Sequence, residues 1–268
     1  MPANQISAAE SVFHVKDTGG DLPPVLCLHS LFMDNRMFDQ FTEDAAGRFR
    51  IIRPDFRGQG GSRPAAGNVI SVEQCAGDIA AIMDMIEVSN AHVLATSMGG
   101  DVALRLAAYR PDLVRTLALL GTSARAEPDE QSQAFVEWVS DVVENGFTGE
   151  RLEFVCGIMF GASSHADPAL KPVISKWSQR MSELDASLAP AMRGVIGRQD
   201  ANPLLSNIDV PTLVLSGEEC PVRPPDWARE LAEGISSAEL VMMPGVGHSP
   251  ILEAHDVVVP RLLDFFSR

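Results

Sequence analysis

The chain has 268 residues, of which 46% are hydrophobic and 21% are charged, and its formal net charge is −15. That length is enough to bury a sizeable core in one large domain or in two. The excess of negative charge argues against nucleic acid and anionic membranes as partners. No apolar run is long enough to cross a bilayer, and the first ten residues lack the basic start and apolar core of a signal peptide.

The four cysteines are widely spaced and form neither a C-x-x-C pair nor a metal-binding pattern. This usage is typical of reduced thiols, so we expect a cytoplasmic protein. The sequence leaves the oligomeric state open. The cysteines are Cys27, Cys75, Cys156 and Cys220.

The first part of the chain alternates predicted strands and helices. A run of apolar residues at 25–28 is typical of a strand buried on both faces, whereas 11–16 alternates in polarity. Ser71 and Gln74 resemble a capping box ahead of apolar residues at helical spacing. Strands are therefore predicted at 11–16, 25–28 and 50–53, and helices within 35–49 and after Ser71.

The stretch from Ala91 to Ala108 carries the first indication of chemistry. A short apolar strand pattern at 92–95 breaks at Thr96-Ser97-Met98-Gly99-Gly100, and an Ala- and Leu-rich helical pattern follows at once. Strand, sharp turn and helix form the context in which G-x-S-x-G marks a nucleophilic serine, here with Ala95 in place of the first glycine. Free N–H groups at the helix start would favour developing negative charge there. A serine that only caps the helix is the alternative.

After a further predicted strand at 116–120, the alternation stops. Between about residues 124 and 202 no strand is predicted, and helix-like segments follow one another. We predict a helical cap over the sheet edge at 124–202, with 1–123 and 203–268 as the core; a separate second domain is the alternative. The cap helices are expected near 129–144, 149–160, 168–184 and 185–198.

The alternating pattern then resumes, which predicts an α/β fold with a mostly parallel sheet and helices on both faces. Strands are expected at 210–216 and 239–243, and helices at 227–232 and 257–266. His248 follows the last strand in a loop flanked by Gly245 and Gly247. Ligands of open α/β sheets bind at the carboxyl ends of the strands, so this loop suits a general base. An ordinary loop histidine is the alternative, but the upstream elbow serine favours the base.

Together these motifs resemble the α/β-hydrolase fold superfamily over nearly the whole chain. The resemblance implies the α/β-hydrolase fold with a helical cap, and no metal or organic cofactor. Leu31–Asp39 and Thr122–Glu130 further resemble the enol-lactonase and carboxylesterase group that includes 3-oxoadipate enol-lactonases. The superfamily resemblance rests on His29–Phe32, Asp55–Ser62, Ala95–Gly100, Pro211–Gly217 and Gly245–His248.

The resemblance also implies roles for individual residues. Ser97 would be the nucleophile and His248 the general base, and the backbone N–H groups of Leu31 and Met98 would hold the oxyanion. The expected reaction cleaves a small carboxylic ester or lactone through an acyl-enzyme on Ser97. Dehalogenases and epoxide hydrolases, which use an aspartate nucleophile, do not fit a serine at position 97.

The third member of the expected triad departs from the family pattern. Where the family has Gly-x-x-Asp, this chain reads Gly217-Glu218-Glu219-Cys220. A neutral thiol cannot stabilise an imidazolium as a carboxylate does, and Cys220 lacks the elbow that would make it the nucleophile. We expect Glu219 to supply the carboxylate, with Glu218, Glu127 and Asp129 as alternatives.

Two rival functions follow from this departure. One is a ligand-binding protein on a degraded hydrolase frame, and the other is cofactor-independent oxygenation or perhydrolysis on the same fold. Candidate substrate contacts have ordinary alternatives as well, namely packing for large apolar side chains and surface exposure for arginines. These candidates are Trp138, Phe160 and Trp177 in the predicted cap, and Arg36 and Arg125.

Overall fold

The computed structural model describes residues 4–62 and 65–268. Its centre is an eight-stranded sheet in the order β1-β2-β4-β3-β5-β6-β7-β8. β1 pairs antiparallel with β2, and β2 with β4, whereas every pair from β4 to β8 is parallel. The α/β prediction with a mostly parallel sheet is confirmed. The strands are β1 (Gln5–Ala8), β2 (Ser11–Asp17), β3 (Pro24–Leu28), β4 (Arg50–Pro54), β5 (Ala91–Thr96), β6 (Val114–Leu120), β7 (Thr212–Gly217) and β8 (Ala238–Met243).

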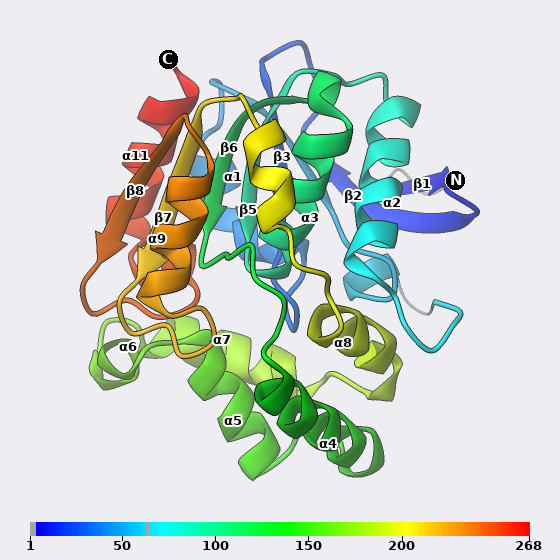
Figure 1. The fold of residues 1–268 in the computed structure, drawn as a ribbon, viewed down its shortest axis with the longest axis vertical. Coiled ribbons are helices and arrows are strands. Elements are labelled where there is room, and N and C mark those ends of the chain that lie inside the picture. The colour runs from blue at the N-terminus through cyan, green and yellow to red at the C-terminus, as the bar shows by residue number, and fades with distance from the viewer. Residues whose placement is uncertain (1–3, 63–64) are drawn as a thin grey trace.

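Helices cover both faces of this sheet, with α2, α3 and α9 in front of it and α11 behind it in Figure 1. The predicted capping box is present, since Ser71 Oγ accepts a hydrogen bond from the Gln74 amide at 3.0 Å. The core helices are α1 (Asp39–Asp44), α2 (Val72–Met85), α3 (Met98–Tyr109), α9 (Pro225–Gly234), α10 (Pro250–Glu253) and α11 (His255–Phe266). Short 3-10 turns are η1 (Asn35–Phe38), η2 (Gly60–Ser62), η3 (Pro111–Leu113) and η5 (Asn202–Asn207).

Five further helices gather at the end of the sheet toward which the β7 and β8 arrows point, at the bottom of Figure 1. We call them the cap helices. They match the four predicted helical segments, and α6 is an additional short helix between two of these. The division into a core and a cap at residues 124 and 202 stays a prediction. The cap helices are α4 (Asp129–Asn145), α5 (Glu150–Met159), α6 (Ala162–Ala166), α7 (Lys171–Ser182) and α8 (Ala189–Ile196), which follows the turn η4 (Ala186–Leu188).

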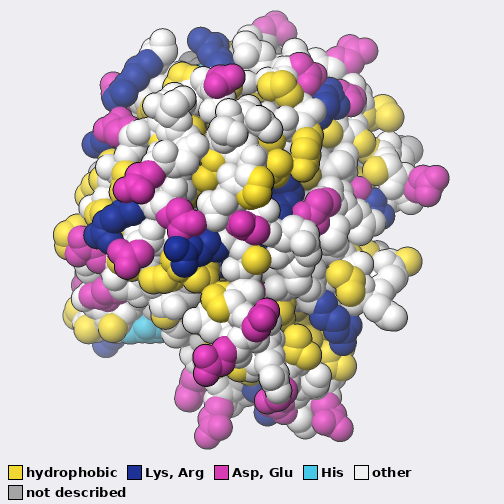
Figure 2. Space-filling model, viewed as in Figure 1, with side chains coloured by type: hydrophobic (Ala, Val, Ile, Leu, Met, Phe, Trp, Pro, Cys, Tyr) yellow, Lys and Arg dark blue, Asp and Glu magenta, His cyan; other side chains and the backbone are white. Residues whose placement is uncertain are grey.

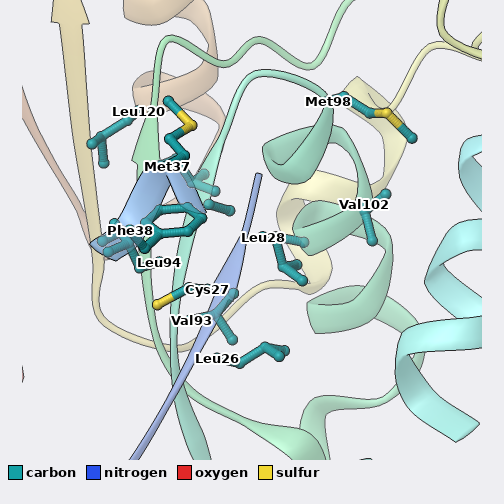
Figure 3. Close-up of a cluster of buried hydrophobic side chains, with 14 of the residues drawn as sticks. Leu26, Cys27, Leu28, Met37, Phe38, Val93, Leu94, Met98, Val102 and Leu120 are labelled. Carbon is teal, nitrogen blue, oxygen red and sulfur yellow. The ribbon is translucent and has the colours of Figure 1, made fainter. Parts of the chain in front are cut away.

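Central position in the sheet explains the apolar strand sequences. Every residue of β5 is buried, because β3 and β6 flank it and helices cover both faces. In Figure 3, Leu26 and Leu28 of β3 lie on the side of Val102 in α3, whereas Cys27 lies on the side of Phe38. Successive side chains of a strand point to opposite faces, so a strand covered on both sides must be apolar throughout.

The surface is acidic over the cap helices, where Asp and Glu side chains gather at the bottom of Figure 2. Along the described residues, no helix combines the length and apolar character that crossing a bilayer requires. All four cysteines are free and buried, and a cytoplasmic location stays a prediction.

Candidate active site

Ser97 stands in the sharp turn between β5 and α3. Its backbone has φ 51° and ψ −117°, a conformation that costs a non-glycine residue about 1–3 kcal/mol. Close packing demands small neighbours, because a Cβ at Gly99 would lie 2.2 Å from the Leu28 carbonyl oxygen, and one at Gly100 would lie 2.0 Å from Thr122 Oγ1. The Ser97 side chain makes no capping hydrogen bond to α3. The alternative of a simple helix cap is therefore wrong.

The structure brings Ser97 and His248 together from opposite ends of the chain. Ser97 Oγ lies 2.7 Å from His248 Nε2, and both side chains are buried. His248 reaches this position from the loop after β8, and Gly121 leaves room for it, since a Cβ there would lie 2.5 Å from the His248 carbonyl oxygen. The geometry suits proton transfer from the hydroxyl to the imidazole.

Cys220 occupies the third position. Its sulfur lies 3.1 Å from His248 Nδ1, the ring nitrogen that faces away from Ser97. Burial raises the pKa of the Cys220 thiol to about 11, against the opposing effect of the Val222 and Arg223 backbone amides and the Arg223 charge. The thiol therefore keeps its proton at neutral pH.

Glu219, which the sequence favoured as the acid, lies elsewhere. Its carboxylate accepts hydrogen bonds from the backbone amide and the hydroxyl of Ser163 in the cap, and these contacts hold its pKa below the usual range. Adjacent residues of a loop point in different directions, so Cys220 faces the imidazole while Glu219 faces the cap. The expectation that Glu219 would contact His248 is therefore wrong.

Within the described residues, none of the alternative acids is hydrogen-bonded to the imidazole either. Glu127 is bound to Arg198 at 2.7 Å, while Glu218 and Asp129 are exposed. Across residues 4–62 and 65–268, no hydrogen bond joins His248 to a carboxylate. The structure thus presents a serine, a histidine and a thiol in line.

Two arginines set the electrostatics around His248. Burial lowers the pKa of His248 to about 3, and the charges of the buried Arg223 and Arg198 act in the same direction. Asp101 Oδ2 lies 3.2 Å from Arg223 and 3.8 Å from Arg198, and Glu127 contacts both arginines. The imidazole is therefore neutral at physiological pH, as a general base must be. Of these four residues, the sequence had singled out only Glu127, as an alternative acid.

The loop that carries Leu31 is fixed by polar contacts below it. His29 Nδ1 donates to the Ser30 carbonyl at 2.8 Å, and His29 Nε2 accepts from the Phe56 amide at 3.1 Å, which sets the ring tautomer. Ser30 Oγ lies 2.9 Å from Thr96 Oγ1, at the end of the strand that leads to the nucleophile. The Ser30 side chain therefore links the loop that carries Leu31 to the end of β5.

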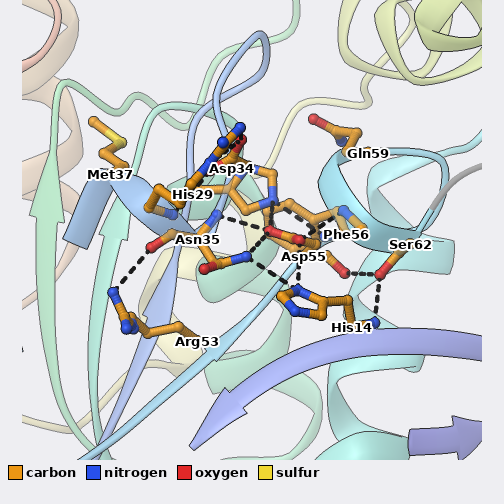
Figure 4. Close-up of polar contacts among 12 residues, drawn as sticks. His14, His29, Asp34, Asn35, Met37, Arg53, Asp55, Phe56, Gln59 and Ser62 are labelled. Carbon is orange, nitrogen blue, oxygen red and sulfur yellow. Dashed lines mark hydrogen bonds and ion pairs between the residues drawn. The ribbon is translucent and has the colours of Figure 1, made fainter. Parts of the chain in front are cut away.

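Asp55 anchors the same loop from its other side (Figure 4). Its carboxylate accepts hydrogen bonds from the backbone and side-chain nitrogens of Asn35 and from the Gly61 amide. Asp55 Oδ2 also lies 3.0 Å from His14 Nδ1. In the described chain, no protein hydrogen bond occupies the backbone N–H of Leu31 or Met98. Both groups are available to a ligand at Ser97.

A cavity of about 80 Å³ opens onto Ser97 and His248. Trp138 is the one of the three candidate aromatics that lines it, whereas Phe160 and Trp177 are buried outside it. Arg36 pairs with Asp34, and Arg125 pairs with Glu230 near the surface, so neither lines the cavity. The apolar walls come from both the core and the cap: Leu31, Phe32, Phe135, Trp138, Val139, Ile158, Met159, Met192, Val195, Ile196 and Val222.

Comparison with known proteins agrees with this geometry. A family model described as alpha/beta hydrolase fold matches residues 23–255. The chain belongs to the alpha/beta hydrolase family. The match confirms the resemblance inferred from the motifs.

Individual relatives of this alpha/beta hydrolase include esterases and lactonases. The chain is 30% identical to a pimeloyl-[acyl-carrier protein] methyl ester esterase of Chromobacterium violaceum, over 92% of this chain and 96% of that protein. It is similar in structure to the enol-lactonase of Burkholderia xenovorans, with a TM-score of 0.89 and 25% identity over 98% of this chain and all of the other. A relative in Mycobacterium tuberculosis, 25% identical over 83% of this chain and 84% of its own length, carries a non-heme bromoperoxidase name.

Proposed function

We propose that the protein is a serine hydrolase that cleaves small, uncharged carboxylic esters or lactones through an acyl-enzyme on Ser97. The observation that carries the proposal is the 2.7 Å contact between Ser97 Oγ and His248 Nε2 at the floor of an apolar cavity. The ester and lactone names of the relatives support the reaction class.

Ser97 attacks the substrate carbonyl while His248 Nε2 takes its proton. The backbone N–H groups of Met98 and Leu31 hold the oxyanion, an interaction worth roughly 3–4 kcal/mol per donor in related acyl chemistry. Return of the proton to the leaving alkoxide leaves the acyl group on Ser97. His248 then activates a water molecule, which attacks the acyl-enzyme and releases the acid.

The cavity walls favour an uncharged acyl group. Glu127 and Arg223 are the charged residues that line it, and each is already paired within the cluster of Asp101, Glu127, Arg198 and Arg223. A substrate carboxylate would have to break such a pair. The small volume favours a short acyl chain, and the cap at residues 124–202 forms one wall of the cavity and so helps set the specificity.

A fluorophosphonate probe tests the nucleophile directly. The proposal requires covalent labelling of Ser97 in the wild type, located by peptide mass spectrometry. The variant Ser97→Ala should fold with an unchanged melting temperature and lose at least about a thousandfold in ester turnover, because it lacks the nucleophile. An unlabelled wild-type protein would instead favour a ligand-binding protein on a hydrolase frame.

A panel of p-nitrophenyl esters and lactones separates hydrolysis from other chemistry on this fold. Hydrolysis yields the free acid in water alone. A perhydrolase, as the bromoperoxidase name of one relative suggests, would form a peracid when hydrogen peroxide is added. Product analysis with and without peroxide distinguishes the two enzymes.

A further inference from the structure

Two glutamates outside the proposed chemistry touch the same turn of the cap. This cap turn, residues 161–164, leads from α5 into α6. Glu219 stands next to Cys220 in the chain, and Glu253 ends α10 shortly after His248. Glu219 thus shares a loop with Cys220, and Glu253 ends the short helix that follows the loop of His248.

Glu253 holds the loop of the histidine. Its carboxylate is only 8% exposed and accepts the Gly247 amide at 2.9 Å and the Ser249 amide at 2.7 Å. These two residues flank His248 in the chain. A carboxylate bound to both neighbours limits how the His248 backbone can move.

The same carboxylate also holds the cap turn. Glu253 accepts the Gly161 amide at 2.8 Å and the Ser164 hydroxyl at 2.6 Å. Glu219 adds a second attachment, since it accepts the backbone amide of Ser163 at 2.7 Å and its hydroxyl at 2.5 Å. Hydrogen bonds to charged acceptors are about twice as strong as those between neutral groups.

Backbone packing shows independently that the two segments meet. A Cβ at Gly247 would lie 2.1 Å from the Gly161 nitrogen, and a Cβ at Gly161 would lie 2.9 Å from the Gly247 nitrogen. Neither position has room for a side chain. The cap turn and the histidine loop are thus in direct backbone contact, and the shared carboxylate binds both.

We propose that Glu253 is a positioning residue that joins the cap turn and the His248 loop into one unit, with Glu219 as a second attachment beside Cys220. This role rests on the proposed function. A cap displacement that admits substrate then also displaces His248, and closure restores its contact with Ser97. Turnover consequently requires the closed cap, as in other enzymes whose lids complete the site.

Hydrogen exchange of the substrate-free protein tests the physical link. Glu253→Gln keeps the size of the side chain but turns an amide NH₂ toward N–H donors. We expect faster exchange at 161–164 and at 247–249 together. Glu218→Gln is the matched control, because this exposed carboxylate lies beside Glu219, and it should leave both segments unchanged. Faster exchange in Glu253→Gln at 247–249 alone would overturn the link to the cap.

Kinetics test the consequence for the reaction. With p-nitrophenyl acetate, Glu253→Gln should lower kcat roughly 10- to 100-fold, because small misplacements of a catalytic group cost about this much, while KM changes little. Ser164→Ala is the second variant, for the case that Glu253→Gln does not fold. It removes one hydrogen bond between Glu253 and the cap turn and keeps the hydrogen bonds of Glu253 to Gly247 and Ser249, and it should also lower kcat. An unchanged kcat in the folded Glu253→Gln or Ser164→Ala variant would overturn the proposal. Wild-type protein that neither reacts with fluorophosphonate nor cleaves the ester would contradict the hydrolase function instead. The hydrogen-exchange experiment would then still decide whether Glu253 connects the cap turn to the His248 loop.

Discussion

Within the described residues, each ring nitrogen of His248 has one hydrogen-bond partner, which is Ser97 Oγ at Nε2 and Cys220 Sγ at Nδ1. Nε2 must be unprotonated to act as a base. The proton of the neutral ring is therefore bound to Nδ1 and points at the Cys220 sulfur. Sulfur is a weak acceptor, and a protonated thiol carries no negative charge to stabilise the imidazolium. Cys220 can orient the ring, but unlike a carboxylate it cannot stabilise the positive charge of the imidazolium.

Cys220→Asp tests this interpretation. We expect turnover that is raised or unchanged, since a carboxylate at Nδ1 would both orient the ring and stabilise the imidazolium. Loss of that carboxylate costs about 10⁴-fold in a serine protease, which sets an upper limit for the gain. Steady-state kcat of the purified variant is the measurement. Cys220→Ser should retain much of the wild-type activity, whereas loss of a robust activity in Cys220→Asp would show that the thiol has another role.

The pH dependence of kcat/KM should reflect the pKa of His248, which burial and two arginines lower to about 3. Activity depends on the neutral imidazole, so it is present above this pKa and lost as the pH falls through it. The wild-type profile should therefore be flat between about pH 5 and 8. In Cys220→Asp the new carboxylate favours the imidazolium and raises the His248 pKa, so the acid limb should move to higher pH. A wild-type limb near pH 6.5, the ordinary range for histidine, would contradict the assignment.

At the scale of elements, a cluster of buried ion pairs connects both ends of the cap to α3, the helix that follows Ser97. Asp101 lies in the first turn of α3, Glu127 precedes α4, and Arg198 follows α8. Arg223 joins them from the loop after β7, so the cluster also reaches the segment that carries Cys220. The two negative and two positive charges balance, which makes each partner costly to remove singly.

Arg198→Met should destabilise the fold by about 3–5 kcal/mol, because it leaves buried carboxylates without their full complement of positive charge. Urea unfolding followed by circular dichroism measures the difference. Arg125→Met is the matched control, since Arg125 is half-exposed and pairs with Glu230 near the surface, where such pairs contribute about 0–1 kcal/mol. Equal effects in the two variants would contradict the buried cluster as a structural requirement.

At the scale of the whole molecule, the reactive groups lie between the parallel sheet and the cap helices. The core supplies Ser97, His248 and Leu31, while α4, α5 and α8 supply apolar walls of the cavity. Phe32 connects the two parts, because it follows Leu31 directly and packs edge-on against Trp138 and Phe147. The cap helices therefore contribute most of the apolar residues that line the cavity.

Trp138→Ala should enlarge the cavity and shift the preferred p-nitrophenyl ester from a short acyl chain to a longer one. The physical reason is that Trp138 lines the cavity that opens onto Ser97. Trp177→Ala is the control, because this buried tryptophan lies outside the cavity and its loss should lower stability by about 3–5 kcal/mol without changing the chain-length order. A chain-length order that does not move in Trp138→Ala would show that the cap wall does not limit the acyl group.

The sequence by itself predicted the fold and singled out Ser97 and His248, whose side chains the structure places 2.7 Å apart. Continuous apolar runs such as 25–28 identify strands covered on both faces, and the elbow around Ser97 is recognisable because its steric demands restrict the neighbouring residues to small ones. The order of Ser97 and His248 along the chain completed the family pattern. Short elements escaped detection, since β1, α6 and α10 are too brief to show a period of their own.

The tertiary structure alone decided what surrounds His248. Glu219 and Cys220 are neighbours in the chain. The family spacing gives the third position to Cys220, whereas the need for a carboxylate favoured Glu219. The structure decides between them, because Cys220 faces the imidazole and Glu219 is bound to Ser163 in the cap turn. Arg198 and Arg223 likewise come from different segments of the chain, and the folded structure brings both of them to Asp101 and Glu127. Local spacing specifies the elements, but the electrostatics of a buried group depend on charges brought close in space.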